Sequence, residues 1–166
     1  CSFFQCENLT SVTLPSTLKA VQEDSFLGCT KLTAITLPDG LEELWDAAFS
    51  YSGIQHIVVP DSVTLMRPDS LGACPALISA VIGTGVTEPQ SHTFAGSDAL
   101  ESVTFRGKLK YVSYCMFSGC RALKKIVLPD SVTAIQEKAF ENSGLTEIQM
   151  GNAVTEIGDY AFSWTP

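Results

Sequence analysis

The sequence predicts a solenoid of about seven stacked coils, each 22–23 residues long and built mainly of short parallel β-strands and irregular segments. Three observations predict it. One apolar residue recurs with gaps of 23, 23, 22, 23, 23, 23 and 22 residues. A short apolar alternation lies between successive copies, and a small residue stands three places after each one. The recurring residues are Phe3, Phe26, Phe49, Leu71, Phe94, Phe117, Phe140 and Phe162.

The first element of each coil is a short strand. In the segment 32–38, apolar residues at 35 and 37 alternate with small or polar neighbours, which is typical of a half-buried strand. Pro38 ends the strand because it has no N–H to donate, and Asp39-Gly40 has the composition of a turn. Stacked in register, these strands form a parallel sheet. The strand recurs at 9–15, 54–60, 100–105, 123–129 and 145–150.

A second inward pair follows each turn, as at Leu41 and Leu44. The segment before each small residue, for example 24–28, is too short for a stable helix and predicts a single helical or 3₁₀ turn. One coil is irregular, because Leu71 replaces the aromatic residue and three prolines lie between 66 and 89. This irregularity predicts either a local change of curvature or a recognition loop. The other inward pairs are Leu18/Val21, Val63/Met66, Leu109/Val112, Val132/Ile135 and Val154/Ile157.

The composition is that of a protein with a continuous core. Of the 166 residues, 45% are hydrophobic and 17% are charged, and no apolar stretch reaches the length of about 18 residues that a membrane-spanning helix needs. We therefore expect one solenoid domain over residues 1–166, without membrane insertion. The chain begins inside a repeat and neither end resembles a cap. We expect a fragment of a longer repeat protein, or copies that self-associate end to end.

The charge is negative overall and unevenly distributed. The formal net charge of −8 disfavours nucleic acids and anionic membranes as partners. Seven of the ten basic residues lie between 106 and 138, where only two carboxylates oppose them. This basic cluster could bind a sulfated glycan or an acidic partner, or it could be a solvated face that balances an acidic neighbour. Its members are Arg106, Lys108, Lys110, Arg121, Lys124, Lys125 and Lys138.

The six cysteines do not require a disulfide framework. Four of them occupy the small-residue position, which serine or threonine fills in the other coils, and this predicts free structural thiols. A bridge between Cys6 and Cys29 is compatible with their place in adjacent coils but is not required. Cys1 and Cys115 stand two residues before the aromatic position, and we expect both at the surface.

The run from Phe117 to Ile135, FSGCRALKKIVLPDSVTAI, resembles the leucine-rich repeats of the Bacteroides surface protein A type (BspA-like, also called Treponema-type). The resemblance covers essentially the whole chain and implies a leucine-rich-repeat solenoid. Family members are cell-surface or secreted proteins, mostly of anaerobic gut and oral bacteria and of some parasitic protozoa. The resemblance therefore implies an extracellular or cell-surface location and adhesion to host or neighbouring cells through a protein or glycan ligand, but it supplies no binding motif.

Two ladders of outward side chains flank the inner residue of each strand. The first is varied and polar and is the leading candidate for a binding face; it comprises Ser11, Ala34, His56, Ser79, Ser102, Lys125 and Glu147. The second is explained by strand propensity alone; it comprises Thr13, Thr36, Val58, Val81, Thr104, Val127 and Gln149.

Trp45 and Arg67 occupy one column on the coil edge. Tryptophan is a typical interface anchor, and Arg67 could stack on its ring. Alternatively, Trp45 only covers the edge of the coil. The family often places glycine in this column, and here only Gly158 keeps it. Arg106, Lys108 and Lys124 of the basic cluster complete the candidate binding residues.

The sequence predicts no catalytic, cofactor or metal site. His56 and His92 are the only histidines, and they lie almost two coils apart without a cysteine or carboxylate at ligand spacing. Cys115 has no histidine at a matching position, and no nucleophile or phosphate-loop motif occurs. We therefore expect a recognition module and not an enzyme. The alternatives are a spacer that presents a neighbouring domain and the targeting arm of a secreted enzyme.

Overall fold

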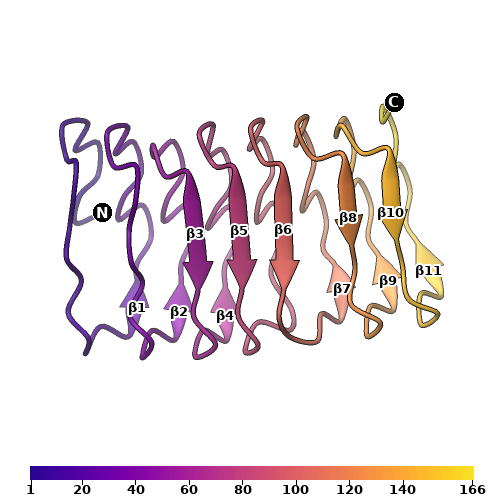
Figure 1. Cartoon of the computed structure of the whole chain (residues 1–166), viewed down its shortest axis with the longest axis horizontal. Helices are drawn as coiled ribbons and strands as arrows, with labels where there is room; N and C mark the ends of the chain where they lie inside the picture. The colour runs from indigo at the N-terminus through magenta and orange to yellow at the C-terminus, as the bar shows by residue number, and fades with distance from the viewer.

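A computed structural model describes all 166 residues. The chain winds into an elongated stack of coils, with the two termini at opposite ends (Figure 1). The predicted solenoid of stacked parallel strands is confirmed. There is no helix, and so none that is long and apolar enough to cross a membrane.

The strands form two rows (Figure 1). All pairings are parallel and join equivalent residues of successive coils, as where His56 pairs with Ser79 and Ser79 with Ser102. The front row contains β3 (His56–Val59), β5 (Ser79–Ile82), β6 (Ser102–Phe105), β8 (Lys125–Val127) and β10 (Glu147–Gln149). The rear row contains β1 (Ala20–Val21), β2 (Glu43–Leu44), β4 (Leu65–Met66), β7 (Tyr111–Val112), β9 (Ala134–Ile135) and β11 (Glu156–Ile157).

Strand pairing is interrupted once within each row. The rear row divides into β1-β2-β4 and β7-β9-β11, and the front row into β3-β5-β6 and β8-β10. The rear interruption falls in the irregular coil at 87–90, where Pro89 cannot donate a hydrogen bond. Gln90 N nevertheless donates to Met66 O at 3.0 Å, and Lys110 N to Thr87 O at 2.9 Å. The irregular coil therefore lacks a rear strand but stays bonded to both neighbouring coils.

The recurring phenylalanines stack face to face inside the solenoid. Ring centroids of Phe94 and Phe117 lie 5.4 Å apart, and those of Phe117 and Phe140 lie 5.2 Å apart, with interplanar angles of 8° and 10°. Leu71 is fully buried at the equivalent position and interrupts the column of rings. The column and the inward residues of both strand rows form one continuous core of 37 buried residues.

The segment around each phenylalanine is a series of turns and not a helix. Phe26 lies between two left-handed residues, Asp24 with φ 52° and Gly28 with φ 74°. Residues with left-handed and right-handed backbone conformations alternate here, which prevents a continuous helix. In place of the predicted helical or 3₁₀ turn there are isolated hydrogen bonds, such as the one from Leu27 N to Asp24 O. The same alternation directs the N–H groups of Asp24, Phe26 and Gly28 toward carbonyls of the next coil. The turns therefore hold successive coils together as the strands do.

The small-residue position is a hydrogen-bond donor as well as a small group. The buried thiols of Cys29, Cys74 and Cys120 donate to the phenylalanine carbonyl of the preceding coil at 3.1–3.2 Å. Ser97 donates to Leu71 O in the same way, at 3.2 Å. Ser52 and Ser143, at the same position, are buried without a hydrogen-bond partner. The position therefore requires a small side chain in every coil and uses its donor only in some of them.

All six cysteines are free, so no bridge joins Cys6 and Cys29. The prediction of a surface position is confirmed for Cys1 but is wrong for Cys115, which is buried. Cys115 has a left-handed backbone, and its thiol lies beside Tyr114 and near Lys138. Burial raises the pKa of this thiol.

Two of the buried thiols make the stability of the fold sensitive to high pH. Burial raises the pKa of both Cys74 and Cys120 to about 12 from an ordinary value of 9.0. When folding raises the pKa of a group, the folded state holds the proton more tightly than the unfolded state. The resulting stabilisation is complete at pH values below the pKa of the unfolded state, and it is lost as the pH rises through the pKa of the folded state. We expect the free energy of unfolding to fall between pH 9 and 12 by on the order of 1 kcal/mol per pH unit for each thiol. Urea titrations across this range measure it.

The matched control is the variant with Cys74→Ser and Cys120→Ser, which keeps the donors but removes both titrating groups. Its stability is expected to fall less steeply over the same pH range. An equal slope in the native and variant proteins would contradict a contribution from the thiols.

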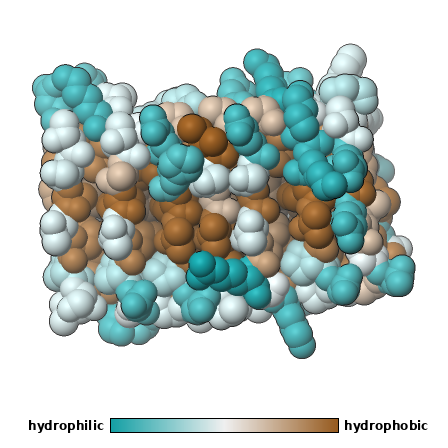
Figure 2. Space-filling model, in the orientation of Figure 1, coloured by the Kyte–Doolittle hydropathy of each residue, from teal (hydrophilic) through white to brown (hydrophobic).

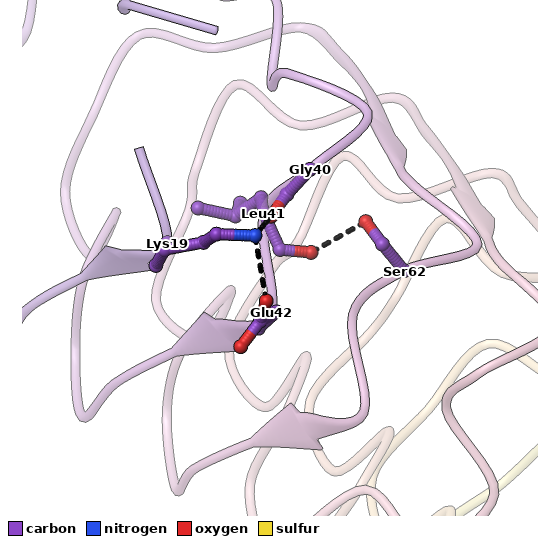
Figure 3. A network of polar contacts seen from close by, with 5 residues as sticks. All are labelled: Lys19, Gly40, Leu41, Glu42 and Ser62. Carbon is purple, nitrogen blue, oxygen red and sulfur yellow. Dashed lines mark hydrogen bonds and ion pairs between the residues drawn. The ribbon is translucent and has the colours of Figure 1, made fainter. Parts of the chain in front are cut away.

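The turns after the front strands are tied to their neighbours by side chains (Figure 3). Lys19 Nζ lies 2.7 Å from Glu42 Oε1 and donates to Gly40 O, while Ser62 Oγ donates to Leu41 O. These contacts connect three successive coils. Surface ion pairs of this kind contribute about 0–1 kcal/mol each, so they help to set the register more than the overall stability.

Candidate binding face

The polar ladder predicted from the sequence lies on the exposed side of the front row. The ring nitrogen Nδ1 of His56 lies 2.8 Å from Ser79 Oγ, and Ser102 follows on β6. Farther along, Lys125 Nζ pairs with Glu147 Oε1 at 2.5 Å. The strands therefore bring these side chains into one line, but two of the candidates neutralise each other.

The second ladder gives the same face an apolar component. Val58 and Val127 are 51% and 50% exposed, respectively, unlike the inward residues next to them. Figure 2 shows hydrophobic surface in brown running across the front face between hydrophilic side chains. The front face therefore offers apolar contact area beside its polar side chains.

The largest depression of the molecule lies on this face and brings together two predicted residues. It has a volume of about 630 Å³ and is lined by His56 and Arg106, with Asp39 and Asp61 at its turns. Its volume falls within the range of about 300–1,000 Å³ that is usual for ligand pockets. Asp61 is held in place because its Oδ1 accepts the N–H of Thr84 at 2.8 Å. We call this hollow the front depression.

Arg106 supplies the one guanidinium in the front depression. It follows β6 in the chain, whereas most of the lining belongs to segments 35–39 and 56–62. Arg106 takes part in none of the six ion pairs of the molecule. Its charge is therefore available to a ligand.

Trp45 and Arg67 form a closed pair on the rear side, after β2 and β4. The guanidinium carbon of Arg67 lies 4.3 Å from the centroid of the Trp45 ring, as a cation–π contact requires. The indole N–H donates to Glu43 at 2.7 Å, and Arg67 lies 4.0 Å from Asp46. Both side chains are half-buried in contacts with each other, which favours the covering role over an interface anchor.

Most side chains of the basic cluster are paired with carboxylates, so the cluster does not form one common site for an anion. Lys110 pairs with Glu88 at 2.8 Å, and this bond lowers the pKa of the Glu88 carboxyl. Arg121, Lys125 and Lys138 also have carboxylate partners, which leaves Arg106, Lys108 and Lys124 without one. Most of the partners stand 22 or 23 residues away in the sequence, and aligning the repeats for opposite charges would have found them.

The front row contains open seams, which the sequence did not reveal. No backbone hydrogen bond joins β6 to β8, and none joins segment 12–14 to segment 35–37. Segment 33–37 meets the coil of β3 at one end, where Ala34 bridges to His56 and Gln55 N donates to Thr33 O at 3.1 Å. Figure 1 shows these wider spacings beside the evenly spaced β3, β5 and β6. Grooves of about 450 Å³ at β6/β8 and 300 Å³ at segment 12–14 follow two of the seams, and the front depression follows the third.

No group of three or more histidine, cysteine, aspartate or glutamate side chains lies close enough together to hold a metal ion. The candidate site is a surface of hydrogen-bonding, charged and apolar groups.

The family comparison covers nearly the whole chain. A family model described as the BspA type leucine rich repeat region matches residues 1–124 and 88–165, in six copies. None of the curated protein sequences is significantly similar.

Solved structures of leucine-rich repeat proteins are similar in fold. One from Bacteroides ovatus superposes with a TM-score of 0.76 and 26% identity, over 96% of this chain and 47% of the other. The T. pallidum leucine rich repeat protein gives 0.65 and 25%, over 71% and 56%. A leucine rich cell surface protein from Faecalibacterium prausnitzii gives 0.50 and 20%, over 99% and 65%, and shows the fold alone. The chain spans about half the length of the first of these proteins.

Proposed function

Because the chain belongs to the BspA-type leucine-rich repeat family, we propose that it is a recognition module of a cell-surface or secreted protein. In this proposal it binds a protein or glycan on host or neighbouring cells through the front face. The observation that carries the proposal is the front depression, in which the repeated fold gathers His56 and the unpaired Arg106. Repeat proteins use such extended surfaces for binding, while their repeated residues build the core.

The chemistry of the front face supports recognition. Arg106 can donate two parallel hydrogen bonds to a carboxylate or sulfate, and Val58 offers exposed apolar area beside it. Arginine and apolar groups at the centre of a patch commonly dominate binding energy. Lys125 and Glu147 pair with each other and would act at the rim. End-to-end association of copies belongs to the same proposal, because Ile157 and Trp164 of the last coil are exposed.

The test is binding of the parent protein to an array of matrix proteins and glycans, with and without substitutions in the front depression. The variant with His56→Ala and Arg106→Ala is expected to lose at least tenfold in affinity for the ligand found, since it loses a central charge and its neighbour. Lys19→Ala, which removes an exposed cation from the turn region of Figure 3, is the matched control and is expected to bind as the native protein does.

The two alternatives predict different results. If the parent protein keeps its full affinity when the front depression is substituted, the spacer role is favoured and the proposal fails. The targeting-arm role requires a catalytic domain in the same protein, whose activity on a bound substrate would fall when this solenoid is deleted.

A further inference from the structure

We propose that the front depression binds an acidic sugar with one carboxylate group per ring and discriminates against sulfated glycans. The inference names a ligand class for that site and rests on the proposed recognition function. It starts from the way in which Arg106 reaches the hollow. Every other lining residue belongs to segments 35–39 and 56–62, so the lining skips the coil of β5, and Arg106 comes from the coil after it.

Gly83 is the residue that lets Arg106 cross the coil of β5. The register of β3, β5 and β6 places Pro60, Gly83 and Arg106 at the same position of three successive coils. Gly83 lies tightly against the preceding coil, since a Cβ atom there would be 2.4 Å from Pro60 O. Because Gly83 has no side chain, none stands between Arg106 and the hollow at this level of the stack. The N–H of Arg106 donates to Ile82 O at 2.9 Å, which fixes the base from which the guanidinium extends.

Two carboxylates share the hollow with this guanidinium. Asp39 and Asp61 take part in none of the six ion pairs, and the N–H of Thr84 occupies only one oxygen of Asp61. The lining contains no lysine and no second arginine. A sulfated chain would bring several negative charges against these two carboxylates, and like charges in a binding site repel. A ligand with a single carboxylate can place it on Arg106 and keep the rest of its surface uncharged.

Hydroxyl groups suit the remaining groups of the lining. The free oxygens of the two carboxylates accept hydrogen bonds, and the exposed hydroxyl of Thr36 can donate or accept one. His56 keeps one ring nitrogen for a ligand, because Nδ1 is engaged with Ser79. Val58, which is half exposed, offers apolar contact to the C–H face of a ring. A hexuronic acid carries a carboxylate, several hydroxyls and a C–H face on one rigid ring, so little ordering opposes its binding.

The test titrates the whole chain, labelled with ¹⁵N, with trigalacturonic acid at pH 7. The fully methyl-esterified trimer is the matched probe, because it has the same rings without the charges, and a heparin tetrasaccharide is the sulfated probe. The acid is expected to bind about tenfold or more tightly than either and to shift the amide resonances of His56 and Val58. Equal binding of the acid and its ester, tighter binding of heparin, or unmoved resonances at these residues would each overturn the inference.

Substitutions at exposed positions test the role of Arg106. Arg106→Gln removes the charge and is expected to weaken binding of trigalacturonic acid by about tenfold or more. Lys108→Gln removes an exposed, unpaired cation two residues farther along, which does not line the hollow, and is expected to leave the affinity within about twofold. Equal affinities of the two variants would overturn the assignment.

The carboxylates are tested by Asp39→Asn combined with Asp61→Asn, which keeps hydrogen-bond acceptors but removes both negative charges. This variant is expected to bind the heparin tetrasaccharide about fivefold or more tightly than the native chain does, while its affinity for trigalacturonic acid changes less. An unchanged ratio of the two affinities would contradict the discrimination against sulfate and overturn the inference.

Failure here is distinguishable from failure of the proposed function. If trigalacturonic acid does not bind while His56→Ala with Arg106→Ala still loses the array ligand, the sugar class is wrong and the recognition site stands. A peptide or protein as that array ligand would be this outcome. If trigalacturonic acid binds as expected while the substituted depression keeps its array ligand, the hollow is a sugar site but not the recognition site of the parent protein.

Discussion

Phe117→Ala is expected to lower the free energy of unfolding by about 3–5 kcal/mol, the largest loss from any single side chain in this fold. Phe117 is fully buried, and its ring lies between those of Phe94 and Phe140. Alanine would leave a cavity between three consecutive coils and remove two stacking contacts. Because each coil contacts only its neighbours, no other part of the chain can fill the space.

Urea denaturation followed by circular dichroism measures this loss. Phe117→Leu is the control, since Leu71 fills the same position without exposure in its own coil, and it is expected to lose only about 1 kcal/mol. Equal losses for the alanine and leucine variants would show that ring packing does not set the stability of the column.

Gly144→Ala is expected to cost about 3 kcal/mol or more, although it adds only one methyl group. A Cβ atom at Gly144 would lie 2.0 Å from Arg121 O and 2.8 Å from its carbonyl carbon. Both atoms belong to the backbone of the preceding coil and cannot rotate away. At Gly53, the equivalent glycine, the closest atom is Thr30 O at 2.2 Å.

These two glycines explain the two gaps of 22 residues in the repeat. Other coils place two residues between the small-residue position and the strand, as in Ser97-Asp98-Ala99-Leu100, whereas Ser143-Gly144-Leu145 has one. The shorter connection brings Gly144 close to the backbone of the preceding coil, where its N–H donates to Cys120 O at 3.1 Å. Only glycine permits that approach.

The explanation predicts a rescue. Replacing Gly144 by the two residues Asp-Ala would restore the 23-residue coil and is expected to recover most of the stability lost in Gly144→Ala. Gly40→Ala is the control, because its Cβ would meet nothing closer than 3.4 Å, and it is expected to change the stability by less than about 0.5 kcal/mol. A similar loss for both alanine variants would refute the close-contact explanation. Thermal unfolding of the four proteins makes the comparison.

Periodicity predicted most of the fold, because buried positions must repeat when coils stack. It located the phenylalanine column, the front strands and the small-residue position with no structural information. It could not show why that position takes cysteine or serine, since the acceptor is a carbonyl of the preceding coil. It also suggested a helical turn where the backbone alternates hands, because none of the left-handed residues at Asp24 and its equivalents is glycine, and at Gly28 and its equivalents only three are.

The candidate site was predictable in part. The alternation in the strands correctly placed His56 and Lys125 on an exposed face, but it carried no information on how far a side chain reaches. Arg106 lies in the front depression with residues from other coils, and Lys125 is neutralised by Glu147. The seams depend on small differences in spacing between coils.

The interruptions of the front row and of the rear row fall at different junctions, and this has a mechanical consequence. Where β6 and β8 are unpaired, β7 and β9 behind them are paired, and where segment 12–14 has no bond to segment 35–37, β1 and β2 behind them are paired. Where the rear strand is missing, β3, β5 and β6 are paired. No cross-section of the stack therefore lacks backbone hydrogen bonds in both rows. A pulling force along the long axis, as on a tether between a cell and a surface in flow, would act against at least one hydrogen-bonded row at every boundary between coils. No boundary would therefore be weak in both rows at once.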